Sequence, residues 1–368
     1  MPLASRPRRL VGGILAAALV AACGAGGPSQ ALPATTAGAS ASASPAPAST
    51  SPASDTPSVV ASGAPSASPV ALTVGLGYIP NVQFAPFYLA DQSGAYEQAG
   101  LHVSLQNKID PDLVTLLGQG ALDIGLSDGT SVIPAVSQGI PVVYTSTIYG
   151  DFPSVLVTTS TTGITKAADL KGKKIGIPGR YGSSWIMLQA LLQSANLTPE
   201  DVTIVEFPDF SQVAGLQQGR VDAATGFSNN EPIQLQNAGV KPVVLTVDDI
   251  VPLPGPGLVT GTATLQAKRD ALAAFTRVTL DGMAQISADP QKGIDATFKA
   301  VPDLAADPAL QRQILDATIA AWKNDRTNAA LGSIDKPGWQ ASVDFMTSLG
   351  LVPNKVTLDQ LVDDSLLP

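Results

Sequence analysis

The chain has 368 residues, of which 45% are hydrophobic and 14% charged, and its formal net charge is −9. This acidic balance argues against binding to nucleic acid and against a basic patch for anionic lipid. One cysteine and one histidine exclude an internal disulfide and a Cys/His metal cluster, so we expect neither a metal nor a cofactor.

The first 22 residues have the pattern of a secretory signal peptide. Three arginines precede an apolar run at 10–22, which ends in Val-Ala-Ala immediately before Cys23. The run is too short to span a bilayer as a helix. Its ending resembles a bacterial lipobox, which implies that Cys23 is lipidated and becomes the mature N-terminus on the extracytoplasmic face of the cell membrane. The alternative is an ordinary signal peptide with an incidental cysteine.

A linker is predicted to follow at 23–70. Positions 24–70 are almost entirely Ala, Ser, Pro, Thr and Gly, and Asp55 is the only charged residue among them. Such a segment has too little apolar surface to offset its chain entropy, so we expect a disordered tether. Whether it is O-glycosylated is left open. The folded part is predicted to begin at about Ala71.

Two halves of the segment 72–246 repeat the same order of elements. Each half begins with an apolar strand, a polar loop and a helix, and continues with a second strand and a short helix that ends in Gln-Gly. A third strand then leads into another polar loop and helix, and a fourth strand closes the unit. The predicted strands are 72–76, 101–105, the segment after 123 and 142–143 in the first half, and 174–177, 202–207, the segment after 222 and 243–244 in the second.

Alternating strands and helices predict a two-lobed α/β fold in which each lobe is a mainly parallel sheet flanked by helices. A Pro/Gly-rich run at 251–257 is predicted to be a crossover or hinge. Helices predicted at 265–286, 308–322, 337–349 and from 358 would return the chain to the first lobe. We therefore expect lobe I at 71–158 and 252–368, lobe II at 159–251, and a ligand cleft between them.

Ligands of open α/β sheets bind beyond the carboxyl ends of the strands. The loops predicted there are 77–83, 127–130, 178–184 and 226–231, and all are rich in Gly, Asn, Ser and Asp. They open onto helix N-termini, where backbone amides lack partners. Four such loops at equivalent positions favour a binding site over ordinary turns.

Several of these residues resemble a known family. The run GYIPNVQFAPFY at 77–88 is similar to the opening motif of type II solute-binding proteins of ABC importers, in the branch of thiamine-pyrimidine, riboflavin and sulfonate binders. GAY at 94–96, AGL at 99–101 and IPGRYGS at 177–183 are similar to further signatures of that branch, and NNEP at 229–232 to a segment at which pyrimidine binders contact ligand. The resemblance implies a periplasmic-binding-protein-like type II fold, a cleft that closes, delivery to permease subunits, and no chemistry.

The predicted ligand-binding residues combine aromatic faces with a few polar groups, as aromatic ligands require. They are Tyr78, Asn81, Phe84, Ser127, Asp128, Tyr149, Arg180, Tyr181, Ser183, Trp185, Phe227, Asn230 and Glu231. Phe84 and Trp185 start helices, so each is either a cleft or a core residue. Glu231 either receives local amides at the helix start or accepts hydrogen bonds from the ligand.

The function predicted from these residues is capture of a small heteroaromatic vitamin or precursor, riboflavin or the thiamine pyrimidine, by a monomeric membrane-anchored protein. A sulfonate or nitrate binder is the alternative. Pyrimidine synthases share the fold, but the single histidine, His102, lies at the edge of a predicted strand rather than in a cleft loop, and we expect no catalytic residues. A purely structural lipoprotein would not need four polar loops at one cleft.

Overall fold

The structure is a computed structural model that describes residues 68–109, 112–323 and 327–368. The predicted signal peptide, Cys23 and the predicted linker up to residue 67 lie outside the described residues. All elements below belong to one compact unit, Gly63–Pro368.

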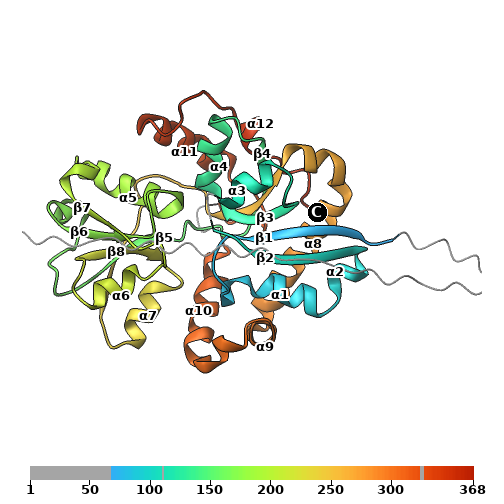
Figure 1. Cartoon of the computed structure of the whole chain (residues 1–368), viewed down its shortest axis with the longest axis horizontal. Coiled ribbons are helices and arrows are strands. Elements are labelled where there is room, and N and C mark those ends of the chain that lie inside the picture. Colours follow the sequence, from blue (N-terminus) through green and yellow to red (C-terminus); the bar gives the residue numbers. More distant parts are fainter. Residues whose placement is uncertain (1–67, 110–111, 324–326) are drawn as a thin grey trace, which may run out of the picture. The chain divides into compact units, whose positions relative to one another are not determined.

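The first sheet has five strands in the order β2-β1-β3-β10-β4 (Figure 1). The strands are β1 Val70–Leu76, β2 Leu101–Asn107, β3 Ile124–Asp128, β4 Val142–Thr147 and β10 Pro256–Gly261. β1 pairs in parallel with β2 and β3, whereas β10 pairs antiparallel with β3 and β4. Four strands therefore run one way, and only β10 runs against them.

The second sheet repeats this plan in the order β7-β6-β8-β5-β9. Its strands are β5 Ser154–Thr159, β6 Lys174–Ile177, β7 Thr203–Glu206, β8 Ala223–Phe227 and β9 Pro242–Leu245. Here β5 is the strand that runs antiparallel to its neighbours, β8 and β9. The predicted two-lobed α/β fold, its mainly parallel sheets and its internal repeat are confirmed, and each sheet contains one antiparallel strand.

One predicted boundary is wrong. The lobes were expected to separate at 158–159, but Ser154–Thr158 pair with β8, so β5 belongs to the second sheet. The chain leaves the first sheet after β4 and returns to it as β10. Because each crossing strand enters its new sheet from the other lobe, it is inserted against the direction of that sheet.

Helices cover both faces of both sheets (Figure 1). They are α1 Ala85–Gln92, α2 Ala95–Gln98, α3 Asp112–Gly118, α4 Gly129–Ser137, α5 Gly182–Ser194, α6 Gln212–Gln217, α7 Glu231–Asn237, α8 Thr262–Ala288, α9 Pro290–Ala300, α10 Pro308–Ala321, α11 Lys336–Ser348 and α12 Leu358–Leu361. The Gln-Gly endings of α3 and α6 place Gly120 and Gly219 in the left-handed region, at φ 71° and 69°. These glycines stop both helices as the repeat predicts.

The core has an apolar layer on each face of the first sheet. On β10, Leu258 packs into one cluster with α1, α8, α9 and α10, while Val259 packs into another with α3, α4, α11 and α12. In the second sheet, Leu156 of β5 packs with α5 and Val157 packs with α6 and α7. Strands buried on both faces leave the loops at their ends as the accessible surface.

Within the described part of the chain, no helix combines the length and apolar character needed to cross a membrane.

Candidate functional site

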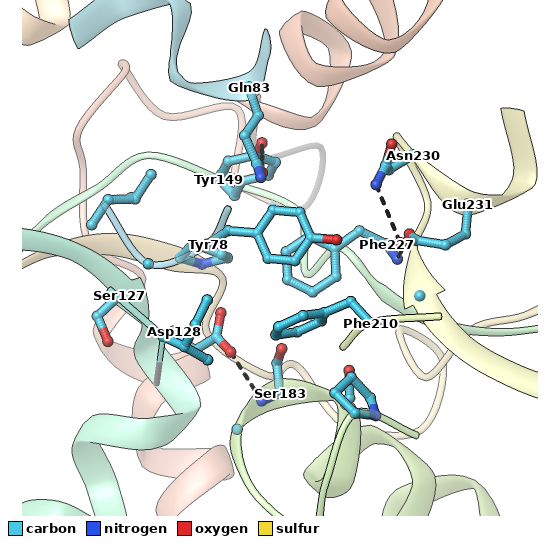
Figure 2. A pocket seen from close by; sticks show the side chains of 18 of the residues that line it. Tyr78, Gln83, Ser127, Asp128, Tyr149, Ser183, Phe210, Phe227, Asn230 and Glu231 are labelled. Atoms are coloured by element: carbon cyan, nitrogen blue, oxygen red, sulfur yellow. Dashed lines mark hydrogen bonds between the residues drawn. The ribbon is translucent and has the colours of Figure 1, made fainter. Parts of the chain in front are cut away.

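A pocket lies where the loops at the carboxyl ends of the strands of both sheets meet (Figure 2). It contains about 840 Å³ of space, part of it open to solvent. The position agrees with the cleft expected from the sequence.

Ten of the thirteen predicted ligand-binding residues line this pocket. They are Tyr78, Phe84, Ser127, Asp128, Tyr149, Tyr181, Ser183, Phe227, Asn230 and Glu231. Phe84 is only 1% exposed, so it serves as core and as pocket wall together. The structure does not bring the other three, Asn81, Arg180 and Trp185, into the lining.

Each of these three residues has a local structural contact instead. The Asn81 side chain accepts a hydrogen bond from the Gln83 amide at 3.0 Å and thereby starts the 3₁₀ helix Val82–Phe84. Arg180 Nε lies 3.2 Å from Glu206 Oε1, and its guanidinium lies over the Trp185 ring at 5.3 Å. Trp185 also packs against the core. The positive charge of Arg180 is thus paired outside the pocket.

Aromatic side chains from both lobes meet in the pocket. Tyr78, after β1, and Phe210, after β7, contact edge to face with ring centroids 5.1 Å apart. Figure 2 shows Phe227 beside them. Phe210 has φ 59°, in the left-handed region that a bulky residue seldom adopts. This conformation directs a large ring from a tight loop into the pocket, where it meets the opposite lobe.

Phe210 and Ile109 were missed from the sequence, although both line the pocket. Ile109 lies between β2 and α3, and Phe210 lies at the equivalent place in the repeat, between β7 and α6. Apart from Tyr149, which follows the fourth strand of the first half, the predicted residues come from loops that follow the first and third strand of each half. The loops after the second strands end at the same edge of the sheet, and this signal would have found both residues.

Asp128 connects the two lobes. It ends β3 of the first sheet, and its Oδ2 accepts a hydrogen bond from the Ser183 amide of α5 at 3.0 Å (Figure 2). Burial raises the pKa of the Asp128 carboxyl, while the hydrogen bonds from the Ser183 amide and hydroxyl act in the opposite direction. α5 has no cap from its own N-cap residue, Tyr181, so a carboxylate from the other lobe serves its first turn.

Glu231 is the second carboxyl of the pocket, and it is 8% exposed. Its Oε2 accepts a hydrogen bond from the Phe227 amide at 2.6 Å, and its Oε1 one from Asn230 Nδ2 at 3.2 Å. Burial raises the pKa of Glu231 to about 7, against the lowering effect of these bonds. Burial, and then the charge of Glu231, also raise the pKa of Tyr78. Glu231 therefore receives local amides and lies in the pocket at the same time.

Gln83, a further lining residue that was not selected from the sequence, leads into a buried polar network. Tyr149 donates its hydroxyl to Gln83 Oε1 at 3.0 Å. Asn229 Nδ2, from the second lobe, donates to Thr318 Oγ1 at 2.7 Å and lies 3.4 Å from the Tyr149 hydroxyl. Paired buried polar groups of this kind fix the position of the side chains that carry them.

The charges of the pocket have one sign. Asp128 and Glu231 are carboxyls, and no lysine, arginine, histidine or cysteine is found among the described residues that line it. His102 is exposed on β2. In the described ranges, no group of three His, Cys, Asp or Glu side chains is arranged to hold a metal ion.

The fold and the pocket define the class of the molecule: a two-lobed α/β protein of the periplasmic-binding-protein type II fold. The structure resembles the periplasmic aliphatic sulphonate binding protein SsuA of Escherichia coli, with a TM-score of 0.64 and 19% identity over 81% of this chain and 99% of that chain. It also resembles the alkanesulfonate-binding protein SsuA of Xanthomonas axonopodis pv. citri, with a TM-score of 0.63 and 18% identity over 82% and 99% of the two chains. At these identities the likeness shows the fold alone.

The sequence comparison identifies the family. The model described as NMT1/THI5 like matches residues 81–293, and the chain belongs to this family. It is 32% identical to the riboflavin-binding protein RibY of Chloroflexus aurantiacus over 315 residues, and this alignment covers 84% of this chain and 90% of that protein. It is 22% identical over 303 residues to a 4-amino-5-hydroxymethyl-2-methylpyrimidine phosphate synthase of Legionella pneumophila, over 81% and 92% of the two chains.

Proposed function

We propose that this protein is the extracytoplasmic solute-binding component of an ABC importer and that its ligand is riboflavin. The observation that carries the proposal is the composition of the pocket, in which Tyr78, Phe210 and Phe227 meet without a cation among the described lining residues. Flat heteroaromatic rings bind well against aromatic faces. The similarity to a riboflavin-binding protein over most of both chains supports riboflavin within that class.

The polar residues of the pocket supply the specificity in this proposal. A ring imide or amine donates a hydrogen bond to the Glu231 carboxylate, which burial has already separated from water. Hydrogen bonds to a charged acceptor contribute about 1.5–3 kcal/mol. Hydroxyl groups of the ligand side chain bind at Ser127, Ser183 and Ser184, which lie at the other wall. Closure of the two lobes then separates the ligand from solvent.

The thiamine pyrimidine is the second candidate, because the chain is also related to pyrimidine phosphate synthases. A sulfonate is disfavoured by the two carboxyls of the pocket, since burying an anion beside them without a cation is costly. An enzymatic role is disfavoured because no nucleophilic cysteine, lysine or histidine is present among the described lining residues. We therefore propose binding without turnover.

Calorimetric titration of the purified protein with riboflavin, the pyrimidine and an alkanesulfonate tests this proposal. We expect riboflavin to bind with quenching of its fluorescence, because an adjacent tyrosine ring donates an electron to the excited flavin. The ligand should be recovered chemically unchanged. Binding of the sulfonate or the pyrimidine in the absence of riboflavin binding would overturn the assignment, and a changed product would overturn the non-enzymatic role.

Anchoring is a separate part of the proposal and rests on the sequence around Cys23. We propose that acyl chains on Cys23 hold the protein at the outer face of the cell membrane, with 23–70 as the tether, so that a monomer can deliver ligand to permease subunits. Metabolic labelling with a radioactive fatty acid should label the wild-type protein and not Cys23→Ser. Equal labelling of the two would refute the anchor and leave the binding function untouched.

A further inference from the structure

The N-terminus of α5 is an anion-binding position that the protein fills with its own carboxyl. The first amides of any α-helix lack partners within the helix, and the helix dipole favours negative charge there. In this 13-residue helix the Ser183 amide donates to Asp128 Oδ2 at 3.0 Å. The Ser183 hydroxyl also contacts the Asp128 carboxyl. A ligand phosphate or sulfonate would find this position occupied.

The backbone around the contact is shaped for it. Gly182 precedes Ser183 with φ 63°, and a Cβ at this position would lie 3.3 Å from Asp128 Oδ2. Any larger residue at 182 would be strained and would crowd the carboxyl. Asp128 reaches this place from the end of β3, so the contact also joins the first lobe to the second. The fold therefore brings a carboxyl and a helix terminus together across the pocket.

No cationic side chain among the described lining residues compensates an incoming anion. The remaining ionisable groups among the described lining residues are the Glu231 carboxyl and the hydroxyls of Tyr78, Tyr149 and Tyr181. Arg180, which lies two residues before α5, contacts Glu206 and Trp185 outside the lining. An anionic ligand group at the N-terminus of α5 would thus meet a fixed carboxyl in place of free amides.

We propose that Asp128 is the residue that makes this pocket selective for uncharged ligands, so that the protein binds riboflavin and rejects its 5′-phosphate. This inference rests on the proposed function and adds the chemical class that the site discriminates. The phosphate ester is rejected because the Asp128 carboxyl already occupies the anion-binding position at α5, and not because of the size of the ring. Removing the charge at residue 128 should therefore admit the phosphorylated ligand.

The test compares riboflavin and riboflavin 5′-phosphate, because both carry the same fluorescent ring and differ by the phosphate. Wild-type protein should bind riboflavin much more tightly than the phosphate ester. Asp128→Asn keeps an oxygen that can accept from the Ser183 amide but removes the charge. Two unit charges about 4–6 Å apart, at the effective dielectric constant of about 20 found in proteins, change binding by roughly a hundredfold to a thousandfold. We expect the ratio of the two dissociation constants to fall by that factor.

Asp344→Asn is the matched control, because it removes one carboxylate from an exposed position on α11 outside the pocket. Its ratio of dissociation constants should equal that of the wild type. If Asp128→Asn does not fold, Asp128→Ser replaces it, since serine is also a helix-capping residue without charge. Thermal melts of each variant establish that it is folded before titration.

The outcomes separate the two claims. Wild-type protein that binds neither flavin refutes the proposed function. Wild-type protein that binds both flavins equally refutes the selectivity, while the proposed function stands. An unchanged ratio in a folded Asp128 variant refutes the role of Asp128. A fall in the ratio that Asp344→Asn reproduces also refutes it, because net charge would then be the cause.

Discussion

Glu231→Gln tests the buried carboxyl of the pocket in two independent ways. Glu231 is 8% exposed, and burial raises its pKa from the ordinary value of 4.5 to about 7. The folded protein therefore binds more protons than the unfolded chain between these pH values. A shift of this size corresponds to about 3 kcal/mol. The free energy of unfolding should fall by that amount as the pH rises from 4.5 through 7, because ionisation stabilises the unfolded state over this range while the folded state keeps its carboxyl protonated.

Glutamine has nearly the same shape and no proton to exchange. The difference in unfolding free energy between wild type and Glu231→Gln should therefore change by about 3 kcal/mol between pH 4.5 and pH 8, with the wild type relatively more stable at the acidic end. Denaturant unfolding at several pH values measures this difference, and the other carboxyls cancel in it. Glu97→Gln, on the exposed surface of α2, should show no such trend.

The same variant tests ligand contact. Losing a hydrogen bond to a charged acceptor should weaken riboflavin binding by roughly tenfold to a hundredfold at pH 8. The wild-type affinity should also fall as the pH decreases through 7, since the protonated carboxyl accepts less well, and Glu231→Gln should lack that dependence. A stability difference that does not vary with pH would show that Glu231 is not a buried ionisable group. Unchanged affinity would remove it from the site.

Three further predictions concern the edges of the site. Phe210→Gly should be more stable than Phe210→Ala by about 1 kcal/mol in denaturant unfolding. Both variants lose the Tyr78 contact, but only glycine adopts the left-handed conformation at φ 59° without strain. The reverse order would show that this conformation is not kept. Arg180→Gln should leave riboflavin affinity unchanged within about twofold, since the arginine contacts Glu206 outside the lining; a tenfold loss would mean that the pocket extends further than the structure shows. Saturating riboflavin should decrease the radius of gyration in solution scattering if the lobes close, and an unchanged curve would contradict closure.

Much of the fold was predictable because the sequence repeats the same order of elements in its two halves. The Gln-Gly helix ends, the polar loops and the apolar strands recur in the same order in both halves, and the structure places them accordingly. The sheet to which β5 belongs was not predictable in this way. Its sequence, Ser-Val-Leu-Val-Thr-Thr, indicates a buried strand but contains nothing that selects one sheet over the other. That choice is made by the crossing of the chain between lobes, which is a tertiary property.

The site was predictable to the extent that strand ends determine it. Residues such as Tyr78, Asp128 and Glu231 lie at strand ends or in the loops that follow them, so their approximate position follows from the topology. Arg180 lies in one of the same loops, yet a glutamate on a neighbouring strand and a tryptophan ring hold it outside the pocket. Side-chain partners from other segments decide such cases, and local sequence does not contain them.

The repeat also explains how the pocket combines two unlike walls. Asp128, at the end of β3, and Asn229, in the loop after β8, both reach the opposite lobe: Asp128 contacts Ser183, and Asn229 contacts Thr318 and Tyr149. Each half thus contributes one side chain that contacts the opposite lobe, but the chemistry of the two contacts differs. The Asp128 carboxyl binds the N-terminus of α5, whereas the neutral Asn229 amide belongs to a hydrogen-bond network around Tyr149. Glu231, two residues after Asn229, is thereby left beside the aromatic rings, where its carboxyl can face a neutral ligand.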